Sequence, residues 1–308
     1  MRERGAMRAK NLLNAAIPMA LAVAVVAGCG AKNGGSESSA TAKSASVTTS
    51  SKSSENTSSS GAVSTASFPI AMKHAYGETV INAKPERVVT LDWNNADAVL
   101  ALGIVPVGTA RANWGPVTDK GLLPWTEEKF KELGTDNPNV FNDLEGYDYE
   151  AVAAAKPDII VAPYSGMDEK AYKRLSEIAP TLPFKETAWK TTWREQTVEA
   201  AEALGLRAEG EKLVADTDAF IKENFAKYPN LANKSVAICY INAADLSSFS
   251  VYRTADPRGA YLTDLGFTFP EKVEALSTDK NAFYVQISSE LAVDALSDTD
   301  IIITYGDD

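Results

Sequence analysis

Aromatic and arginine side chains stand just beyond the strand-like runs in the first half of this sequence. The runs end at Leu91, Gly108 and Ala162. Four candidate binding residues follow them: Trp93, Arg111, Trp114 and Tyr164. Ligands of open α/β sheets meet the loops at the carboxyl ends of strands, so parallel strands would bring these side chains to one rim. Arginine offers charge and a planar donor fork, and the aromatic rings offer broad faces. The alternative for each residue is a solvated arginine or a half-buried ring.

The second half of the chain offers three further candidates: Tyr252, Arg253 and Tyr284. Tyr252 and Arg253 end a short strand-like run, from which we expect them to face a cleft opposite Arg111. Arg258 is a weaker candidate, because it can pair locally with Asp256 or cap a turn instead.

The residue types argue against catalysis and against a metal centre. The chain has one histidine, His74, and two cysteines. A transition-metal site normally recruits several His, Cys or carboxylate ligands. We find no Gly-x-Ser-x-Gly elbow for a hydrolase. We therefore expect no enzyme activity, no metal site and no cofactor, and we expect His74 to pack or hydrogen-bond in a hairpin formed by residues 68–80.

The two halves of the chain resemble each other, which predicts two related α/β lobes. Glu150 and Glu290 each open a predicted helix, and they are 140 positions apart. Asp158 and Asp300 each precede an isoleucine-rich run, and they are 142 positions apart. Two lobes form a cleft, where small ligands bind. The alternative is a single α/β domain in which βα units resemble one another by chance.

A helical segment, residues 191–228, lies between the halves. Thr192 and Glu195 have the spacing of a capping box, and Gly205 predicts a break into two helices. Apolar residues recur at helical spacing on both sides of the break. The predicted fold class is α/β, with two lobes joined by a helical backbone segment and a ligand cleft between them.

The N-terminus predicts export and a lipid anchor. A basic region is followed by an apolar run, Leu12–Ala27, and then by Gly28 and Cys29. This order is that of a secretory signal. The small residues before Cys29 resemble a bacterial lipobox, which implies that Cys29 is acylated and becomes the new N-terminus. The alternative is an uncleaved membrane anchor with an incidental cysteine. Residues 31–67 are rich in Ser, Thr, Gly and Ala, contain no aromatic residue before Phe68, and predict a disordered stalk.

The charge excludes one class of partner. The net charge is −11 at pH 7. Nucleic-acid affinity depends on neutralising phosphates with basic side chains, so we expect no nucleic-acid partner.

Several short motifs, in this order, resemble the siderophore-type periplasmic substrate-binding proteins of ABC importers. The motifs are His74-Ala75-Tyr76-Gly77, Pro85-Glu86-Arg87, Leu91-Asp92-Trp93, Lys156-Pro157-Asp158, Trp193-Arg194-Glu195-Gln196 and Ala203-Leu204-Gly205. The resemblance runs from about Phe68 to Asp308, and the order and spacing of the motifs make it specific.

The resemblance implies a type III solute-binding protein that captures a ferric siderophore. It also implies docking to the membrane permease through one glutamate per lobe, here Glu150 and Glu290. The alternative for both glutamates is stabilisation of a helix N-terminus alone. The implied partners are the ferric siderophore, the ABC permease with its ATPase, and the membrane through Cys29. We expect a monomer on the extracytoplasmic face of the cell membrane, with a rigid link and a small closing motion.

Together these inferences divide the chain into five parts. They are a signal peptide (1–28), a lipidated Cys with a disordered linker (29–67), an N-terminal α/β lobe (68–190), a connecting helical segment (191–228) and an incomplete C-terminal α/β lobe (229–308). The last lobe is called incomplete because members of the resembled family continue past the strand at which this sequence stops.

Other functions stay open at this stage. Heme, cobalamin or another metal chelate would suit the same fold, and a heme binder would need an axial ligand such as Tyr164, Tyr252 or Tyr284. An anchored hydrolase and a structural surface lipoprotein are less favoured.

Overall fold

The computed structural model describes residues 66–142 and 145–306. The predicted signal peptide, the lipidated Cys29 and the linker up to residue 65 lie outside the described residues, as does the apolar run that precedes Cys29. Among the described residues, no helix combines the length and the apolarity needed to cross a membrane.

The described chain begins with a β-hairpin, as the sequence predicts. Strands β1 (Ile70–His74) and β2 (Gly77–Ile81) pair antiparallel, and Gly77 turns the chain at a φ of 128°. The Nε2 atom of His74 lies 3.0 Å from the Thr79 hydroxyl, and the Tyr76 amide donates to Nδ1. The prediction that His74 serves the hairpin is confirmed.

The first lobe is built on a parallel sheet of five strands in the order β5-β4-β3-β6-β7. The strands are β3 (Val88–Thr90), β4 (Gly108–Ala110), β5 (Val140–Phe141), β6 (Ile159–Val161) and β7 (Thr181–Leu182). The helices are α1 (Asn95–Ala101), α2 (Pro124–Glu132), α3 (Tyr149–Ala154) and α4 (Glu169–Ser176). Every residue of β3 and β6 is buried, as a sheet covered on both faces requires.

One strand boundary differs from the sequence prediction. The strand expected to end at Gly108 begins there. Pro106 has no amide hydrogen to donate to a ladder, which delays the pairing to the residues that follow. Close packing also fits glycine at this point, since a Cβ on Gly108 would lie 2.2 Å from Phe141 Cζ.

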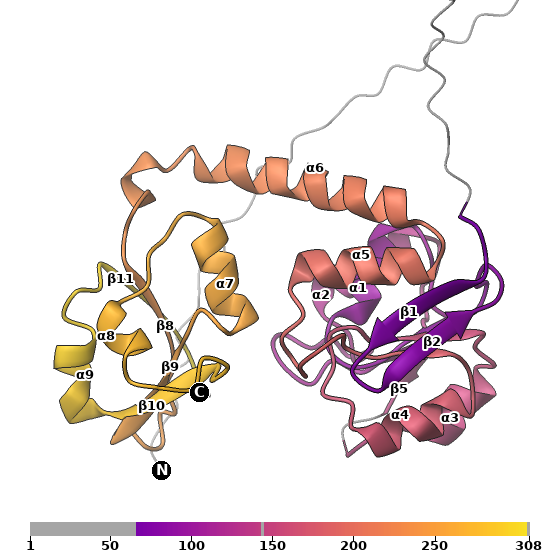
Figure 1. The fold of residues 1–308 in the computed structure, drawn as a ribbon, viewed down its shortest axis with the longest axis horizontal. Coiled ribbons are helices and arrows are strands. Elements are labelled where there is room, and N and C mark those ends of the chain that lie inside the picture. Colours follow the sequence, from indigo (N-terminus) through magenta and orange to yellow (C-terminus); the bar gives the residue numbers. More distant parts are fainter. Residues whose placement is uncertain (1–65, 143–144, 307–308) are drawn as a thin grey trace, which may run out of the picture. The chain divides into compact units, whose positions relative to one another are not determined.

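Two helices follow the first sheet, and Figure 1 shows α6 running on towards the strands of the second lobe. Helix α5 (Trp193–Ala203) begins with the predicted capping box of Thr192 and Glu195. Gly205, at a φ of 70°, separates it from α6 (Arg207–Phe225), so the predicted break is confirmed. The predicted apolar stripe of α6 is only partly buried: Phe220 is 66% exposed, and the other four members are half-buried (Leu213, Val214, Ile221 and Phe225).

The second lobe is a mixed sheet of four strands in the order β10-β9-β8-β11. The strands are β8 (Val236–Tyr240), β9 (Ser248–Tyr252), β10 (Tyr284–Ser288) and β11 (Ile301–Tyr305). Its helices are α7 (Pro257–Asp264), α8 (Glu271–Glu274) and α9 (Ser289–Ala295), and a 3-10 turn, η1 (Pro229–Leu231), precedes β8. Strands β8 and β11 pair parallel, whereas β9 pairs antiparallel with both of its neighbours.

The internal repeat has a structural counterpart in two aspartates. Asp158 accepts hydrogen bonds from the amides of Glu86 and Arg87, at the entry to β3. Asp300 accepts a bond from the amide of Ser235, at the entry to β8. Each aspartate therefore joins the start of one parallel strand to the start of its neighbour, which supports the prediction of two related α/β lobes.

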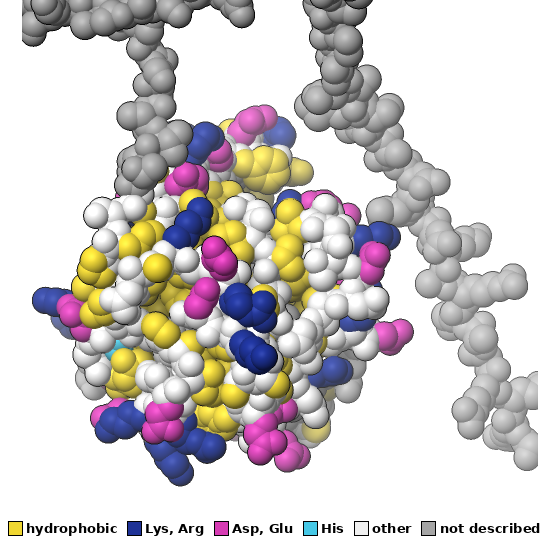
Figure 2. All heavy atoms as spheres, turned by 90° about the vertical axis from the view of Figure 1, so that its right-hand side faces the viewer, with side chains coloured by type: hydrophobic (Ala, Val, Ile, Leu, Met, Phe, Trp, Pro, Cys, Tyr) yellow, Lys and Arg dark blue, Asp and Glu magenta, His cyan; other side chains and the backbone are white. Residues whose placement is uncertain are grey.

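Figure 2 shows one face of the protein, the side on which the first lobe lies. Basic and acidic side chains are interspersed there among apolar ones. A nucleic-acid interface would gather basic side chains into one patch. This face carries no such patch among the residues that the structure describes.

Candidate functional site

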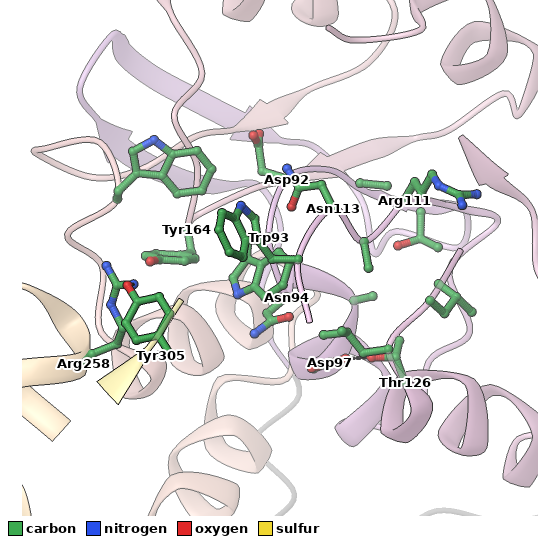
Figure 3. Close-up of a pocket in the computed structure, with 18 of the residues that line it drawn as sticks. Asp92, Trp93, Asn94, Asp97, Arg111, Asn113, Thr126, Tyr164, Arg258 and Tyr305 are labelled. Atoms are coloured by element: carbon green, nitrogen blue, oxygen red, sulfur yellow. Dashed lines mark hydrogen bonds between the residues drawn. The ribbon is translucent and has the colours of Figure 1, made fainter. Parts of the chain in front are cut away.

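A cavity of about 1070 Å³ is lined by residues from both lobes. From the first lobe come Trp93, Arg111, Trp114, Tyr147, Tyr164 and Trp189, and from the second come Tyr240, Tyr252, Arg258, Tyr284 and Tyr305. The lining residues of the first lobe follow the carboxyl ends of parallel strands, as the sequence rule predicts. Figure 3 shows the rings of Trp93 and Tyr164 next to Tyr305 and Arg258 of the second lobe.

Trp93 occupies a tight loop between β3 and α1. Asp92 and Asn94, on either side of it, have left-handed backbones with φ values of 58° and 57°. Asp and Asn tolerate this conformation better than most residues. The Tyr147 hydroxyl donates a 2.7 Å hydrogen bond to the Asp92 carboxylate, which holds the start of the loop.

Tyr164 and Trp189 form the next part of the first wall. Their ring centroids lie 5.3 Å apart at an interplanar angle of 77°. Trp189 has a φ of 60°, and its indole lies over Gly166, where a Cβ would approach Nε1 to 2.3 Å. Burial, followed by the nearby Asp256 carboxylate, raises the pKa of Tyr164, so its hydroxyl stays protonated.

Arg111 and Trp114 complete the first wall at its outer end. Arg111 packs against Gly121, where a Cβ would lie 2.6 Å from Nη1. Trp114 is 53% exposed, so much of its indole is accessible to a ligand. The structure thus brings all four candidates of the first half to one cavity.

The second wall is a cluster of tyrosines around one guanidinium. Arg258 donates from Nε and Nη2 to the Asp256 carboxylate, at 2.8 Å each, and from Nη1 to the Tyr305 hydroxyl at 2.8 Å. The Tyr305 hydroxyl donates to that of Tyr252 at 2.6 Å. Arg258 also lies 4.0 Å from the centroid of the Tyr252 ring, a cation–π contact. Burial, followed by the bond to Tyr252, raises the pKa of Tyr305.

Arg253 is a correction to the sequence analysis, because the structure does not bring it to the cavity. It is 5% exposed, pairs with Glu274 at 2.9 Å, and donates to the Asp279 carbonyl at 2.6 Å. Neighbouring residues of a strand point to opposite faces, and Tyr252 already takes the face towards the cavity. Arg258, the weaker candidate, makes the predicted pair with Asp256 and lines the cavity as well.

The charged side chains of the cavity lining balance one another. Two carboxylates, Asp92 and Asp97, line it together with two guanidiniums, Arg111 and Arg258. Burial raises the pKa of Asp97, and hydrogen bonds from Thr126 and Trp125 oppose that effect. No group of three or more His, Cys, Asp or Glu placed to hold a metal ion exists among residues 66–142 and 145–306.

Glu150 and Glu290 occupy matching positions on the two lobes. Each is the second residue of its helix, α3 or α9, and each is exposed. The side chains of Asp148 and Ser288 cap the two helices. Each cap satisfies an amide at the start of its helix, so neither glutamate is needed as the cap. Both glutamates are therefore accessible to a partner.

Sequence reasoning did not select Trp189, Tyr240 or Tyr305. Tyr240 and Tyr305 are register partners at the ends of β8 and β11, so the strand-end rule could have found them. Trp189 follows β7 by several residues and has no comparable signal.

Comparisons with known proteins identify relatives of this chain. The family model described as periplasmic binding protein matches residues 88–307. The probable siderophore-binding lipoprotein YfiY of Bacillus subtilis is 29% identical over 76% of this chain and 68% of its own length. The Fe(3+)-citrate-binding protein YfmC of the same organism is 29% identical over 64% of this chain, which spans only 58% of that relative.

Solved structures show the same relationship. PiaA of Streptococcus pneumoniae, in complex with ferrichrome, is 46% identical over 78% of this chain and 79% of its own, with a TM-score of 0.72. SirA of Staphylococcus aureus, complexed with staphyloferrin B, is 28% identical over 78% of this chain and 77% of its own, with a TM-score of 0.61.

Proposed function

The chain belongs to the periplasmic binding protein family, and from that premise we propose that it captures a ferric siderophore and delivers it to an ABC importer. The observation that carries the proposal is the cavity of about 1070 Å³ between two aromatic walls. Its volume suits a ligand the size of an iron chelate. Two relatives of the chain are named as a probable siderophore-binding lipoprotein and an Fe(3+)-citrate-binding protein. The reaction is binding and release, without catalysis.

The charge of the cavity favours one class of chelate. Its lining carries two carboxylates and two guanidiniums, and one of the guanidiniums is already paired with Asp256. A strongly anionic ferric catecholate would require a net positive lining, whereas an uncharged ferric hydroxamate would not. We therefore assign the cavity to a ferric hydroxamate, held by ring faces and by the arginine forks.

Delivery rests on the two exposed glutamates and on the anchor. Glu150 and Glu290 would pair with basic residues of the permease, which works with its ATPase. Cys29, acylated after removal of residues 1–28, would hold the protein at the extracytoplasmic face of the membrane, and residues 31–67 would form the stalk. The two lobes (68–190 and 229–308) and the connecting segment (191–228) would act as a single monomeric carrier.

The helical connection limits how far the lobes move. Arg194 of α5 pairs with Asp218 of α6 at 2.6 Å and with Asp264 of α7. One guanidinium therefore joins both helices of the connecting segment to the second lobe. We expect ligand binding to be accompanied by a small closing motion rather than a wide hinge movement.

Tryptophan fluorescence tests the ligand assignment, because three of the five tryptophans line the cavity. The purified protein is titrated with ferrichrome, metal-free ferrichrome, a ferric catecholate, ferric citrate, heme and cobalamin, each with an absorbance-matched control. We expect saturable quenching with ferrichrome and weaker binding of the ferric catecholate. Preference for heme or cobalamin would replace the siderophore, and no saturable binding by any member of the panel would refute the carrier function.

Uptake by cells tests the delivery step separately. Glu150→Ala combined with Glu290→Ala is expected to abolish uptake of the bound chelate while leaving its dissociation constant unchanged. Normal uptake by this double variant would contradict docking through the glutamates.

A further inference from the structure

One buried carboxamide joins the two loops that carry the central rings of the first wall. It belongs to Asn95, the first residue of α1, whose side chain is 1% exposed. Trp93 lies in the loop before it, and Tyr164 lies in the loop after β6. We propose that Asn95, held in turn by Gln196 of α5, is a positioning residue that fixes both loops at one spacing before a ligand arrives.

The hydrogen bonds of Asn95 use its full capacity. A carboxamide offers two N–H donors and two acceptor sites on its oxygen. Nδ2 donates to the Leu91 carbonyl at 2.6 Å and to the Tyr164 carbonyl at 2.9 Å. Oδ1 accepts from the Tyr164 amide at 3.2 Å and from Gln196 Nε2 at 2.9 Å. Aspartate has nearly the same shape, but it lacks both donors and would turn an oxygen towards two carbonyls.

The bonds fall where the backbone needs support. Leu91 ends β3, and the bond to its carbonyl closes the loop whose residues Asp92 and Asn94 are left-handed. Such conformations persist only where surrounding contacts hold them. At Tyr164, one side chain binds both the amide and the carbonyl, which fixes the orientation of that residue. Asn95 thus holds the backbone on both sides of the gap between the two rings.

Gln196 connects this arrangement to the helical segment. It is 8% exposed, and its donor to Asn95 comes from the second turn of α5. The same helix start is tied to the Tyr164 loop by Thr191, whose hydroxyl donates to the Pro163 carbonyl at 2.6 Å. Two bonds therefore link the first wall to α5, and α5 carries the Arg194 bridge to the second lobe.

Because the loops of this wall are already held in place, ligand binding has to order fewer side chains and less backbone. Fixed rings lose little freedom when a ligand arrives, so more of the contact energy appears as affinity. The inference rests on the proposed function only for its affinity readout, because the spacing of the loops can be measured in the unliganded protein.

Hydrogen exchange of the unliganded full chain, followed by mass spectrometry, tests the first part. Asn95→Asp is expected to speed exchange of the segments around 91–95 and 162–166 by about tenfold, because the buried carbonyls of Leu91 and Tyr164 lose their donor. Gln196→Met removes the donor to Asn95 and keeps a side chain of similar size, so it should speed exchange of the same segments by a smaller factor. The control is Ile287→Val, a core change in β10 of the second lobe that lowers stability in a cluster containing neither loop. Acceleration of the two segments no greater than in this control would overturn the proposal.

Ferrichrome titration of the same variants tests the second part. We expect Asn95→Asp to weaken ferrichrome binding by about tenfold or more. Gln196→Met should weaken it by a smaller factor. The Ile287→Val variant should keep the affinity of the unmodified protein, because Ile287 does not line the cavity. Unchanged affinity in both amide variants would refute the positioning role. If the unmodified protein binds no ferric chelate, the proposed function fails, while the exchange result still decides whether Asn95 orders the loops.

Discussion

The two walls of the cavity are held by different kinds of interaction. In the first wall, the loops that carry Trp93 and Tyr164 follow strands of a fully parallel sheet and are fixed by bonds between the buried Asn95 carboxamide and backbone groups. In the second wall, ring contacts among tyrosines and the ion pair of Arg258 with Asp256 dominate, and Asp256 also accepts a hydrogen bond from the Arg258 amide.

This difference predicts a division of work between the walls. Backbone-directed bonds fix ring positions closely, and the first wall should therefore supply shape recognition. Side-chain contacts adjust more readily, and the second wall should follow the ligand. Tyr284 of the second wall is 52% exposed, whereas Tyr240, Tyr252 and Tyr305 are half-buried.

Arg253 should support the second wall without touching the ligand. Arg253→Met leaves Glu274 without its ion-pair partner and removes three bonds to carbonyls, so we expect the free energy of unfolding to fall by about 3 kcal/mol. The measurement is urea unfolding followed by fluorescence. Ferrichrome affinity of the folded variant should match that of the unmodified protein, and a large loss of affinity would place Arg253 in the site after all.

Trp93 should contribute more affinity than Tyr284. Trp93→Ala removes a ring from the fixed wall, and we expect ferrichrome binding to weaken by about thirtyfold or more, as for a central contact residue. Tyr284→Ala removes a half-exposed ring from the adjustable wall and should cost several-fold less. Calorimetric titration of both variants measures the ratio. Equal losses would contradict the division between the walls.

Glu199 should make the stability of α5, the helix that is hydrogen-bonded to the first wall, sensitive to pH. Burial raises its pKa from 4.5 to about 7, with Lys185 opposing the effect and Glu195 and Glu202 adding to it. Between pH 4.5 and about 7 the folded protein binds more protons than the unfolded chain, so stability falls as pH rises. The penalty is absent below pH 4.5 and complete above about pH 7.

Glu199→Gln removes this ionisation. We expect the variant to be more stable than the unmodified protein at pH 8 by about 1–2 kcal/mol, and to show little difference at pH 4.5. Thermal unfolding across this pH range, with the exposed Glu209→Gln as control, measures the effect. A constant difference at all pH values would show that Glu199 ionises normally in the folded protein.

Tyr305→Phe should give the smallest effect, confined to the second wall. The change keeps the ring but removes the hydroxyl that accepts from Arg258 and donates to Tyr252. We expect ferrichrome affinity to fall by about fivefold, the value of one net hydrogen bond. Hydrogen exchange around Tyr164 should not change. Faster exchange there would show that the two walls are coupled, against the contrast drawn above.

Local patterns in the sequence predicted several features of the fold correctly. The hairpin at Gly77, the capping box at Thr192 and the break at Gly205 each depend on a few neighbouring residues. The same holds for Trp93 and Tyr164, because the end of a buried parallel strand is visible in the sequence and defines the rim.

Features that depend on distant partners were predicted poorly. The apolar stripe of α6 has a clear period but is only partly covered, because periodicity shows which residues share a face and not what covers that face. Trp189 reaches the cavity through a left-handed backbone and the space above Gly166, neither of which its neighbours in the sequence indicate.

Arg253 and Arg258 show most clearly which features follow from the sequence and which depend on tertiary packing. The sequence by itself determined that Arg253 and Arg258 follow the end of a strand, and that Asp256 stands near enough to pair with one of them. Only the tertiary structure decided that Arg253 turns inward to Glu274 while Arg258 lines the cavity. Arg253 follows Tyr252 and points away from the cavity because an extended chain alternates its faces, whereas Arg258 stands on α7, which packing far from the strand in sequence brings to the cavity.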